Sequence, residues 1–166
     1  GKYPPMVYLG VEGTDLTFSF RYRHLGEGGM IWFFVDGDDG FGSVDHMLRV
    51  KLLREEIHLE VDAHSKDERH PLRQNNRPAD KLSGAFRLNE LLPVEKVDLK
   101  ANEWREVKLV FQGDRVEISI NDTLWQKTLR RSNFNAGKRK LLWMQNGGEK
   151  GIEIDDIHVR ASSQNP

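Results

Sequence analysis

The chain has 166 residues, which fits one domain with a proper core, so no second domain is expected. Its 25 basic and 26 acidic side chains nearly cancel and leave no overall field that would recruit nucleic acid or an anionic membrane. The absence of cysteine excludes disulfides and zinc–thiolate sites, and no apolar run approaches the roughly 18 residues of a membrane span.

The first half of the chain contains patterns that are typical of strands. Residues 1–13 are expected to form an extension or a first edge strand. In Asp15–Arg23 every second residue is apolar, which predicts a half-buried strand. Met30–Val35 is apolar without alternation and too short for a helix, which favours a strand covered on both faces near the middle of a sheet. Asp36–Gly42 is so rich in Asp and Gly that it predicts a loop.

The middle of the chain combines a hairpin with a long polar stretch. His46–Leu52 and Ile57–Val61 alternate and are joined by a short link, which predicts two paired strands. Ala63–Ser83 is polar and interrupted by proline, so we expect a long loop, which in a compact domain is usually functional or mobile. Phe86–Leu92 fits either a helical turn or a short strand.

The last third repeats an alternating run, a polar turn and another alternating run. Trp104–Gln112 and Val116–Ile120 flank Gly113-Asp114, and Lys140–Gln145 and Ile152–Val159 continue the pattern. We interpret this third as an antiparallel meander, with Trp104 in the core. At least nine strand-like segments predict an all-β fold, a two-sheet antiparallel β-sandwich over residues 14–160, followed by a polar tail over 161–166.

The run from Asn102 to Asp122 resembles a segment of concanavalin A-like jelly-roll domains: a Trp, an alternating strand, Gly-Asp, a second strand and Asn-Asp. Gly151–Arg160 is similar to their closing strand, and Asp15–Arg23 to their early strand. These domains include laminin-G-like modules and the bacterial 3-keto-disaccharide hydrolases. The resemblance implies a jelly-roll sandwich with a saccharide-facing groove, often in secreted or periplasmic bacterial proteins that act on glycans.

The sequence lacks the Glu-x-Asp-x-x-Glu signature of the laminarinase-like glycosidases. Retaining hydrolysis needs two carboxyl groups about 5 Å apart, and no acidic pair alternates on a predicted inner strand. Glu153 and Asp155 have the spacing, but a solvated face explains them. A non-catalytic role is therefore favoured over a glycosidase.

Asp36, His46 and Arg49 form the favoured constellation. Asp36 follows one central strand, while His46 and Arg49 lie in the next, so antiparallel pairing would bring all three to one end of a groove. An arginine offers a planar set of donors for sugar hydroxyls or carboxylates, and a histidine can serve as acid or base near neutral pH. The three are candidate catalytic residues if the protein is an enzyme. The alternative is an ion pair with a satisfied histidine at a strand end.

Three tryptophans are candidate stacking platforms for a sugar ring, because aromatic faces cover apolar C–H patches. They are Trp32, Trp125 and Trp143, and Trp125 is expected to be the most exposed because it follows a turn. Gln145, at a strand end, suits hydrogen bonds to hydroxyls. The alternative is that each tryptophan belongs to the core.

Structural calcium is the one cofactor considered, because carboxylates on a Gly-rich loop suit this ion. Asp36, Asp38 and Asp39, with Asp45 nearby, are the candidate ligands in the loop. The resemblance to concanavalin A-like domains adds Asp155 or Asp156 of the closing strand. The alternative for the loop is an acidic turn.

The favoured function is a carbohydrate-binding or substrate-recognition module of an exported bacterial protein, with an oligosaccharide or polysaccharide as partner and further domains in a longer chain. Two alternatives remain: a glycoside-cleaving enzyme of the 3-keto-disaccharide hydrolase type, and a structural or protein-interaction laminin-G-like domain. No nucleic-acid partner is expected, since the local basic residues at 130–131 and 138–140 fit a solvated turn.

Overall fold

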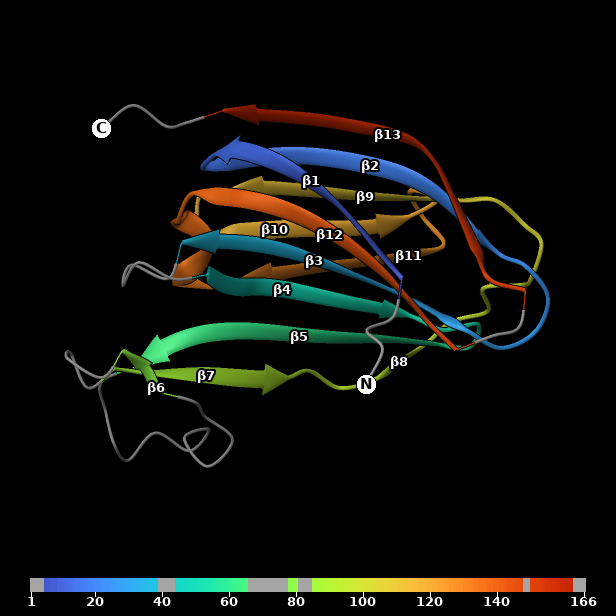
Figure 1. The fold of residues 1–166 in the computed structure, drawn as a ribbon, viewed down its shortest axis with the longest axis horizontal. Coiled ribbons are helices and arrows are strands. Elements are labelled where there is room, and N and C mark those ends of the chain that lie inside the picture. Colours follow the sequence, from blue (N-terminus) through green and yellow to red (C-terminus); the bar gives the residue numbers. More distant parts are fainter. Residues whose placement is uncertain (1–4, 39–43, 66–77, 81–84, 148–149, 163–166) are drawn as a thin grey trace.

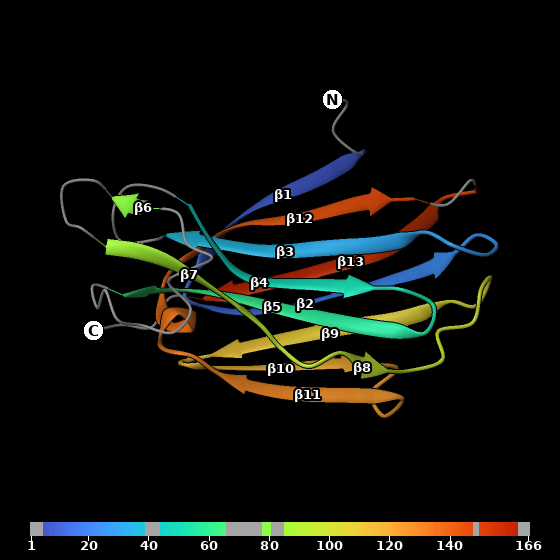
Figure 2. The same ribbon diagram turned by 90° about the horizontal axis from the view of Figure 1, so that it is seen from below.

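The computed structural model describes residues 5–38, 44–65, 78–80, 85–147 and 150–162. These residues form two antiparallel sheets, which lie as two layers (Figures 1 and 2). The predicted all-β, two-sheet sandwich is therefore confirmed. No helix in this part of the chain is long and apolar enough to cross a membrane.

Each sheet joins a strand from the start of the chain to one from its end. The eight-stranded sheet contains, in spatial order, β1 (Met6–Gly13), β12 (Lys138–Asn146), β3 (Met30–Asp38), β4 (Val44–Leu52), β5 (Glu56–Ser65), β7 (Ala85–Leu91) and β6 (Pro78–Asp80), with β8 (Glu95–Lys96) pairing with β5. The five-stranded sheet contains β11 (Trp125–Arg130), β10 (Arg115–Ile120), β9 (Arg105–Gln112), β2 (Asp15–His24) and β13 (Ile152–Ser162). A one-turn 3₁₀ helix, η2 (Ser132–Asn135), lies between β11 and β12.

The core lies between the two sheets and is rich in aromatic side chains. β2 alternates as predicted, since its apolar positions are buried while the residues between them face outward. The ring of Phe20 lies 5.2 Å from that of Phe33 in β3 and 5.6 Å from that of Trp143 in β12, both edge to face. Aromatic contacts of this geometry add to the apolar area buried between the layers.

The C-terminal third is only partly the meander that its pattern predicts. The hairpin of β9 and β10 is confirmed, and Gly113 in its turn has a φ of 59°, a left-handed conformation that suits glycine. The continuation is wrong, because β12 pairs with β1 and β3 while β13 pairs with β2 in the other sheet. β11 has no counterpart among the predicted strands, because Lys127 interrupts its apolar positions.

β3 extends further than its sequence indicates. It continues to Asp38, so Asp36 lies in a strand and not in the predicted loop; residues 39–43 lie outside the described residues. Gly37 lies within the strand because the chains approach closely there: a β-carbon on it would lie 2.6 Å from the carbonyl oxygen of Gly137.

The middle of the chain holds more strand than predicted. The β4–β5 hairpin is confirmed, with Leu52 opposite Ile57. The long loop predicted for Ala63–Ser83 is wrong at its start, because β5 runs to Ser65, and β6 lies within the same stretch. Residues 66–77 and 81–84 lie outside the described residues. Phe86–Leu92, left open between helix and strand, lies largely in β7.

His24, at the end of β2, makes stability depend on pH. Its side chain is buried against Tyr22, with ring centroids 5.5 Å apart. Burial lowers the pKa of His24 below its usual 6.5, and the nearby charge of Arg54 lowers it further. The unfolded chain therefore binds a proton at this residue before the folded chain does, and the free energy of unfolding is expected to fall as the pH drops from 7 to 5, with a slope of up to about 1.4 kcal/mol per pH unit.

Denaturant unfolding of His24→Gln at the two pH values checks this expectation, because the variant has no imidazole to protonate at this position. Its loss of stability between pH 7 and 5 should be smaller than that of the wild type. His158→Gln is the matched control, since the side chain of His158 is 71% exposed. An unchanged slope in His24→Gln would contradict the assignment.

Candidate functional site

The outer surface of the eight-stranded sheet carries a group of polar and aromatic side chains. Ile31, Phe33 and Val35 of β3 point into the core, so Trp32 and the other residues between them point outward. Neighbouring strands add side chains in register, such as Arg49 opposite Phe34 and Lys51 opposite Trp32. We call this surface the polar face and define it by Trp32, Asp36, His46, Arg49, Lys51, Glu60 and Lys140.

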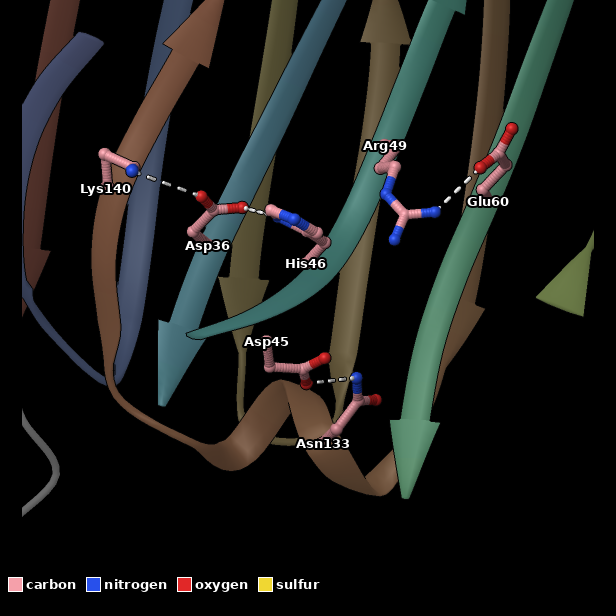
Figure 3. Close-up of polar contacts among 7 residues, drawn as sticks. All are labelled: Asp36, Asp45, His46, Arg49, Glu60, Asn133 and Lys140. Carbon is pink, nitrogen blue, oxygen red and sulfur yellow. Dashed lines mark hydrogen bonds and ion pairs between the residues drawn. The ribbon is translucent and has the colours of Figure 1, made fainter. Parts of the chain in front are cut away.

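At one end of the polar face Asp36 lies between two basic side chains (Figure 3). Asp36 is 1% exposed, and its Oδ1 lies 2.7 Å from Nδ1 of His46. Its Oδ2 lies 3.8 Å from Nζ of Lys140. Because a carboxylate only accepts hydrogen bonds, we assign the proton to Nδ1 of His46, which leaves Nε2 as an acceptor in the neutral ring.

His46 reaches this face because of a β-bulge. Val35 lies opposite Leu48, whereas the next residue, Asp36, lies opposite His46. Met47 is therefore the extra residue of β4, and it is buried in the core beside Leu48. Strict alternation would have pointed His46 into the core.

At the other end Glu60 of β5 binds two cations of β4. Arg49 NH1 lies 2.8 Å from Glu60 Oε2, and Lys51 Nζ lies 2.6 Å from Oε1. Arg49 and Glu60 are each 8% exposed. Burial raises the pKa of Glu60, but the hydrogen bonds from Lys51 and Arg49 lower it by more, so the pKa is below its usual value. The carboxylate is ionised at neutral pH.

Trp32 is the predicted platform that lies on the polar face. Its indole is half-buried, with Lys51 Nζ 4.2 Å from the centre of the ring and the ring of Phe34 4.8 Å away. Lys51 thus contacts both Trp32 and Glu60, which makes one cluster of the aromatic ring and the Arg49–Glu60 pair.

The other two candidate platforms, Trp125 and Trp143, are buried, which corrects the expectation that Trp125 is exposed. Trp143 is 2% exposed because it lies opposite Phe33 and points into the core. Trp125 is 9% exposed because it begins β11 opposite the buried Ile120. Neither ring is open to a sugar.

Gln145 and Trp104 also differ from their predicted places. Gln145 lies opposite the buried Ile31, so it points away from the polar face and lines a small, mostly apolar cleft of about 160 Å³ at the sheet margin. Trp104, expected in the core, is half-buried between the guanidinium groups of Arg21 and Arg23, each 4.8 Å from its ring centre.

The candidate calcium ligands among the described residues do not form one cluster. Asp36 is bonded to His46, and Asp38 binds the guanidinium of Arg139. Asp45 is buried on the opposite side of β4 and accepts a hydrogen bond from Asn133, as Figure 3 shows. Asp155 lies on β13 in the other sheet, and Asp39 lies outside the described residues. In the described part of the chain, no three His, Cys, Asp or Glu side chains form a metal site. Structural calcium stays a prediction.

The basic residues around η2 do not gather into one cationic surface. Lys138 is buried, and burial lowers its pKa to about 8 although the charge of Asp15 opposes this shift. Its ammonium group donates to the carbonyl oxygens of Thr14 and Phe134. The exposed members are paired with acidic groups: Arg130 with Asp114, Arg131 with Glu90 and Arg139 with Asp38.

The predicted Asp36, His46 and Arg49 constellation forms only in part. Asp36 and His46 are in contact, whereas Arg49 binds Glu60 and belongs to the second cluster. Sequence reasoning missed Glu60, Lys51 and Lys140 as members of the site. Glu60 and Lys51 could have been found from the sequence. The short turn of the β4–β5 hairpin fixes which residues lie opposite each other, and it places Arg49 opposite Glu60.

The two carboxylates of the polar face do not have the arrangement of a retaining glycosidase. Asp36 and Glu60 lie on β3 and β5 with β4 between them, so their backbones are about 10 Å apart across the sheet. A retaining glycosidase needs its two carboxyl groups about 5 Å apart. Both groups also bind cations, and the lowered pKa of Glu60 makes it a poor proton donor.

No protein-family model and no curated protein matches the sequence. Among solved structures, a tetrameric galectin from the ball sponge Cinachyrella is similar with a TM-score of 0.61 and 11% identity, over 95% of this chain and 99% of that one. The carbohydrate-binding module CBM66 from Bacillus subtilis is similar with a TM-score of 0.54 and 16% identity, over 97% and 85% of the two chains.

An alginate lyase, PA1167 from Pseudomonas aeruginosa, is similar with a TM-score of 0.52 and 10% identity, over 89% of this chain and 65% of that one. All three are sandwiches of the concanavalin A-like kind. At these identities the likeness concerns the arrangement of strands. The chain has a concanavalin A-like β-sandwich fold.

Proposed function

We propose that the polar face binds an oligosaccharide or polysaccharide and does not cleave it. The observation that carries this proposal is the cluster of Trp32, Lys51, Arg49 and Glu60, which puts an aromatic ring beside fixed charged donors and acceptors on one outer face. The names of two similar structures, a galectin and a carbohydrate-binding module, support it.

The cluster suits a sugar for two physical reasons. The exposed part of the indole can cover the apolar C–H side of a pyranose ring. Arg49 and Lys51 are held in place by Glu60, so a sugar meets oriented cationic side chains and binding costs little side-chain freedom. At the Asp36 end, His46 and Lys140 add an acceptor and a donor to the same surface.

Trp32→Ala is expected to weaken sugar binding about tenfold, because it removes the stacking surface. Calorimetric titration with a panel of neutral and acidic oligosaccharides measures the affinity. Trp104→Ala is the matched control, since Trp104 is also half-buried and also contacts cationic side chains, but packs against Arg21 and Arg23 of the five-stranded sheet. Its affinity should stay within twofold of the wild type.

Two results would overturn the proposal. One is the absence of heat with every oligosaccharide at millimolar concentration. The other is an unchanged affinity in a folded Trp32→Ala variant. Incubation with 3-keto-glycosides and product analysis tests the non-catalytic part, because a binding module releases no free sugar.

The setting is a further part of the proposal: the module works in a secreted or periplasmic protein, beside other domains that act on glycans. The resemblance of residues 102–122 to exported bacterial jelly-roll domains supports this setting. Detection of the protein in the periplasm or the medium, against a cytosolic marker, tests it.

A further inference from the structure

β1 offers a stretch, Met6–Gly10, with no device that prevents pairing with another strand. The margins of the two sheets in the described part of the chain are β1, β6, β8, β11 and β13. A margin strand presents N–H and C=O groups to any extended chain, and proteins protect such strands with charges, proline, bulges or short length.

The other four margins carry such protection. β8 consists only of Glu95 and Lys96, which are both charged. β6 has three residues and begins with Pro78. β11 carries Lys127 and Arg130. β13 is interrupted after Asp155, where Asp156 has a φ of 54°. β1 has a register shift after Gly10 and carries Glu12, but before them it reads Met-Val-Tyr-Leu-Gly, with no charge, no proline and no bulge.

The first four side chains of β1 are apolar and exposed. Met6 is 46% exposed, Val7 63%, Tyr8 68% and Leu9 40%. Val7 lies opposite Trp143, which points into the core, so Val7 and Leu9 point to the core side of the sheet. They are nevertheless uncovered at the margin of the layer, where Figure 2 shows β1.

The backbone of β1 is complementary to itself. The amide of Gln145 donates to the carbonyl oxygen of Pro5. Hydrogen-bonded pairs alternate along an antiparallel ladder, so Val7 and Leu9 also bond to β12. The N–H and C=O groups of Met6, Tyr8 and Gly10 therefore point to the free side. These three residues are symmetric about Tyr8.

We propose that β1 pairs antiparallel with β1 of a second copy of this chain, about a two-fold axis at Tyr8. Tyr8 then lies opposite Tyr8 of the second copy, and Met6 lies opposite Gly10, so that every free donor of these residues meets an acceptor. Val7 lies opposite Leu9 of the second copy and covers it on the core side. The pairing joins the two eight-stranded sheets into one, an isologous interface.

This axis is perpendicular to the sheet, so the polar faces of the two copies lie on the same side. Two sugar sites would then meet one glycan surface and gain avidity. The pairing itself does not depend on sugar binding, and its test involves no sugar.

Sedimentation velocity over a concentration series tests the pairing. The wild type is expected to dimerise, and the double variant Val7→Lys, Leu9→Lys to stay monomeric while it still unfolds cooperatively, since Val7 is 63% and Leu9 40% exposed. Thr128→Lys on the β11 margin is the matched control and should dimerise as the wild type does. A wild type that stays monomeric at its highest soluble concentration would overturn the proposal.

A cysteine at the axis gives the register, because the chain has none of its own. Directly opposite residues of a hydrogen-bonded pair have Cα atoms about 5.5 Å apart, which suits a disulfide. Tyr8→Cys should therefore form a covalent dimer under mild oxidation. Met6→Cys is the control, because the two copies of Met6 lie about 13 Å apart along the strands. Equal cross-linking of both variants, or of neither, would refute the register.

Discussion

Glu60→Ala is expected to lower the free energy of unfolding by about 2–4 kcal/mol, because it leaves the nearly buried guanidinium of Arg49 and the ammonium of Lys51 without their shared carboxylate. Arg49 is 8% exposed, so water can replace the lost partner only in part. Urea unfolding followed by tryptophan fluorescence measures the change. The same variant should weaken sugar binding, since it frees the donors that Glu60 orients.

Glu56→Ala is the matched control for this result. Glu56 lies on the same strand and the same side, and it too is bonded by two basic side chains, those of Lys96 and His58. The side chain of Glu56 is 30% exposed against 11% for Glu60, and ion pairs open to water contribute little. Glu56→Ala should therefore lose clearly less stability than Glu60→Ala. Equal losses in both variants would show that the network around Glu60 is no more than a surface ion pair.

The pH dependence distinguishes Glu60 further. Its pKa in the folded protein lies below the usual 4.5, so its contribution to stability is present above about pH 4.5 and is lost as the pH falls through the folded pKa. The difference in stability between the wild type and Glu60→Ala should therefore shrink in acid. This window lies below that of His24.

Phe20→Ala is expected to cost about 3–5 kcal/mol, because it opens a cavity where both sheets meet. The ring of Phe20 is fully buried and contacts Phe18, Phe33 and Trp143. Denaturant unfolding of the variant measures the loss.

Ser19→Ala is the control for this substitution, since Ser19 is the next residue along β2 and points outward. It should change stability by no more than about 0.5 kcal/mol. Phe20→Leu should fall between the two, because leucine refills part of the space. A loss below about 1 kcal/mol in Phe20→Ala would mean that the layers close over the gap.

The sequence allowed us to predict which face of most strands is buried, but not which strands pair with one another in a sheet. Alternation assigned Phe20 to the core, and the β4–β5 hairpin followed from a short turn. Lys140 lies beside Asp36 only because β12 pairs with β3. These strands are about a hundred residues apart in the chain, and no local pattern encodes their pairing. His46 faces outward because one extra residue, Met47, interrupts the alternation, and a bulge leaves no clear mark in a single sequence.

The tryptophans show the same limit. All three candidates follow or lie within strand-like runs, and composition does not say which side each one occupies. Trp125 was misplaced because Lys127 hides the pattern of β11, whereas Trp32 was placed correctly only as a candidate among three. The register with a neighbouring strand decides each case: Trp143 lies opposite a core phenylalanine and Trp32 lies opposite Lys51.

The pairing of early strands with late ones also governs how this chain reaches its native state. β2 pairs with β13, so that Leu16 lies opposite Ala161, and β1 pairs with β12. The entropy of closing such long loops is lost before these contacts form, so folding is expected to take milliseconds to seconds. During translation, β1 and β2 are synthesised long before their partners β12 and β13. Their apolar side chains therefore stay uncovered until β13 has left the ribosome.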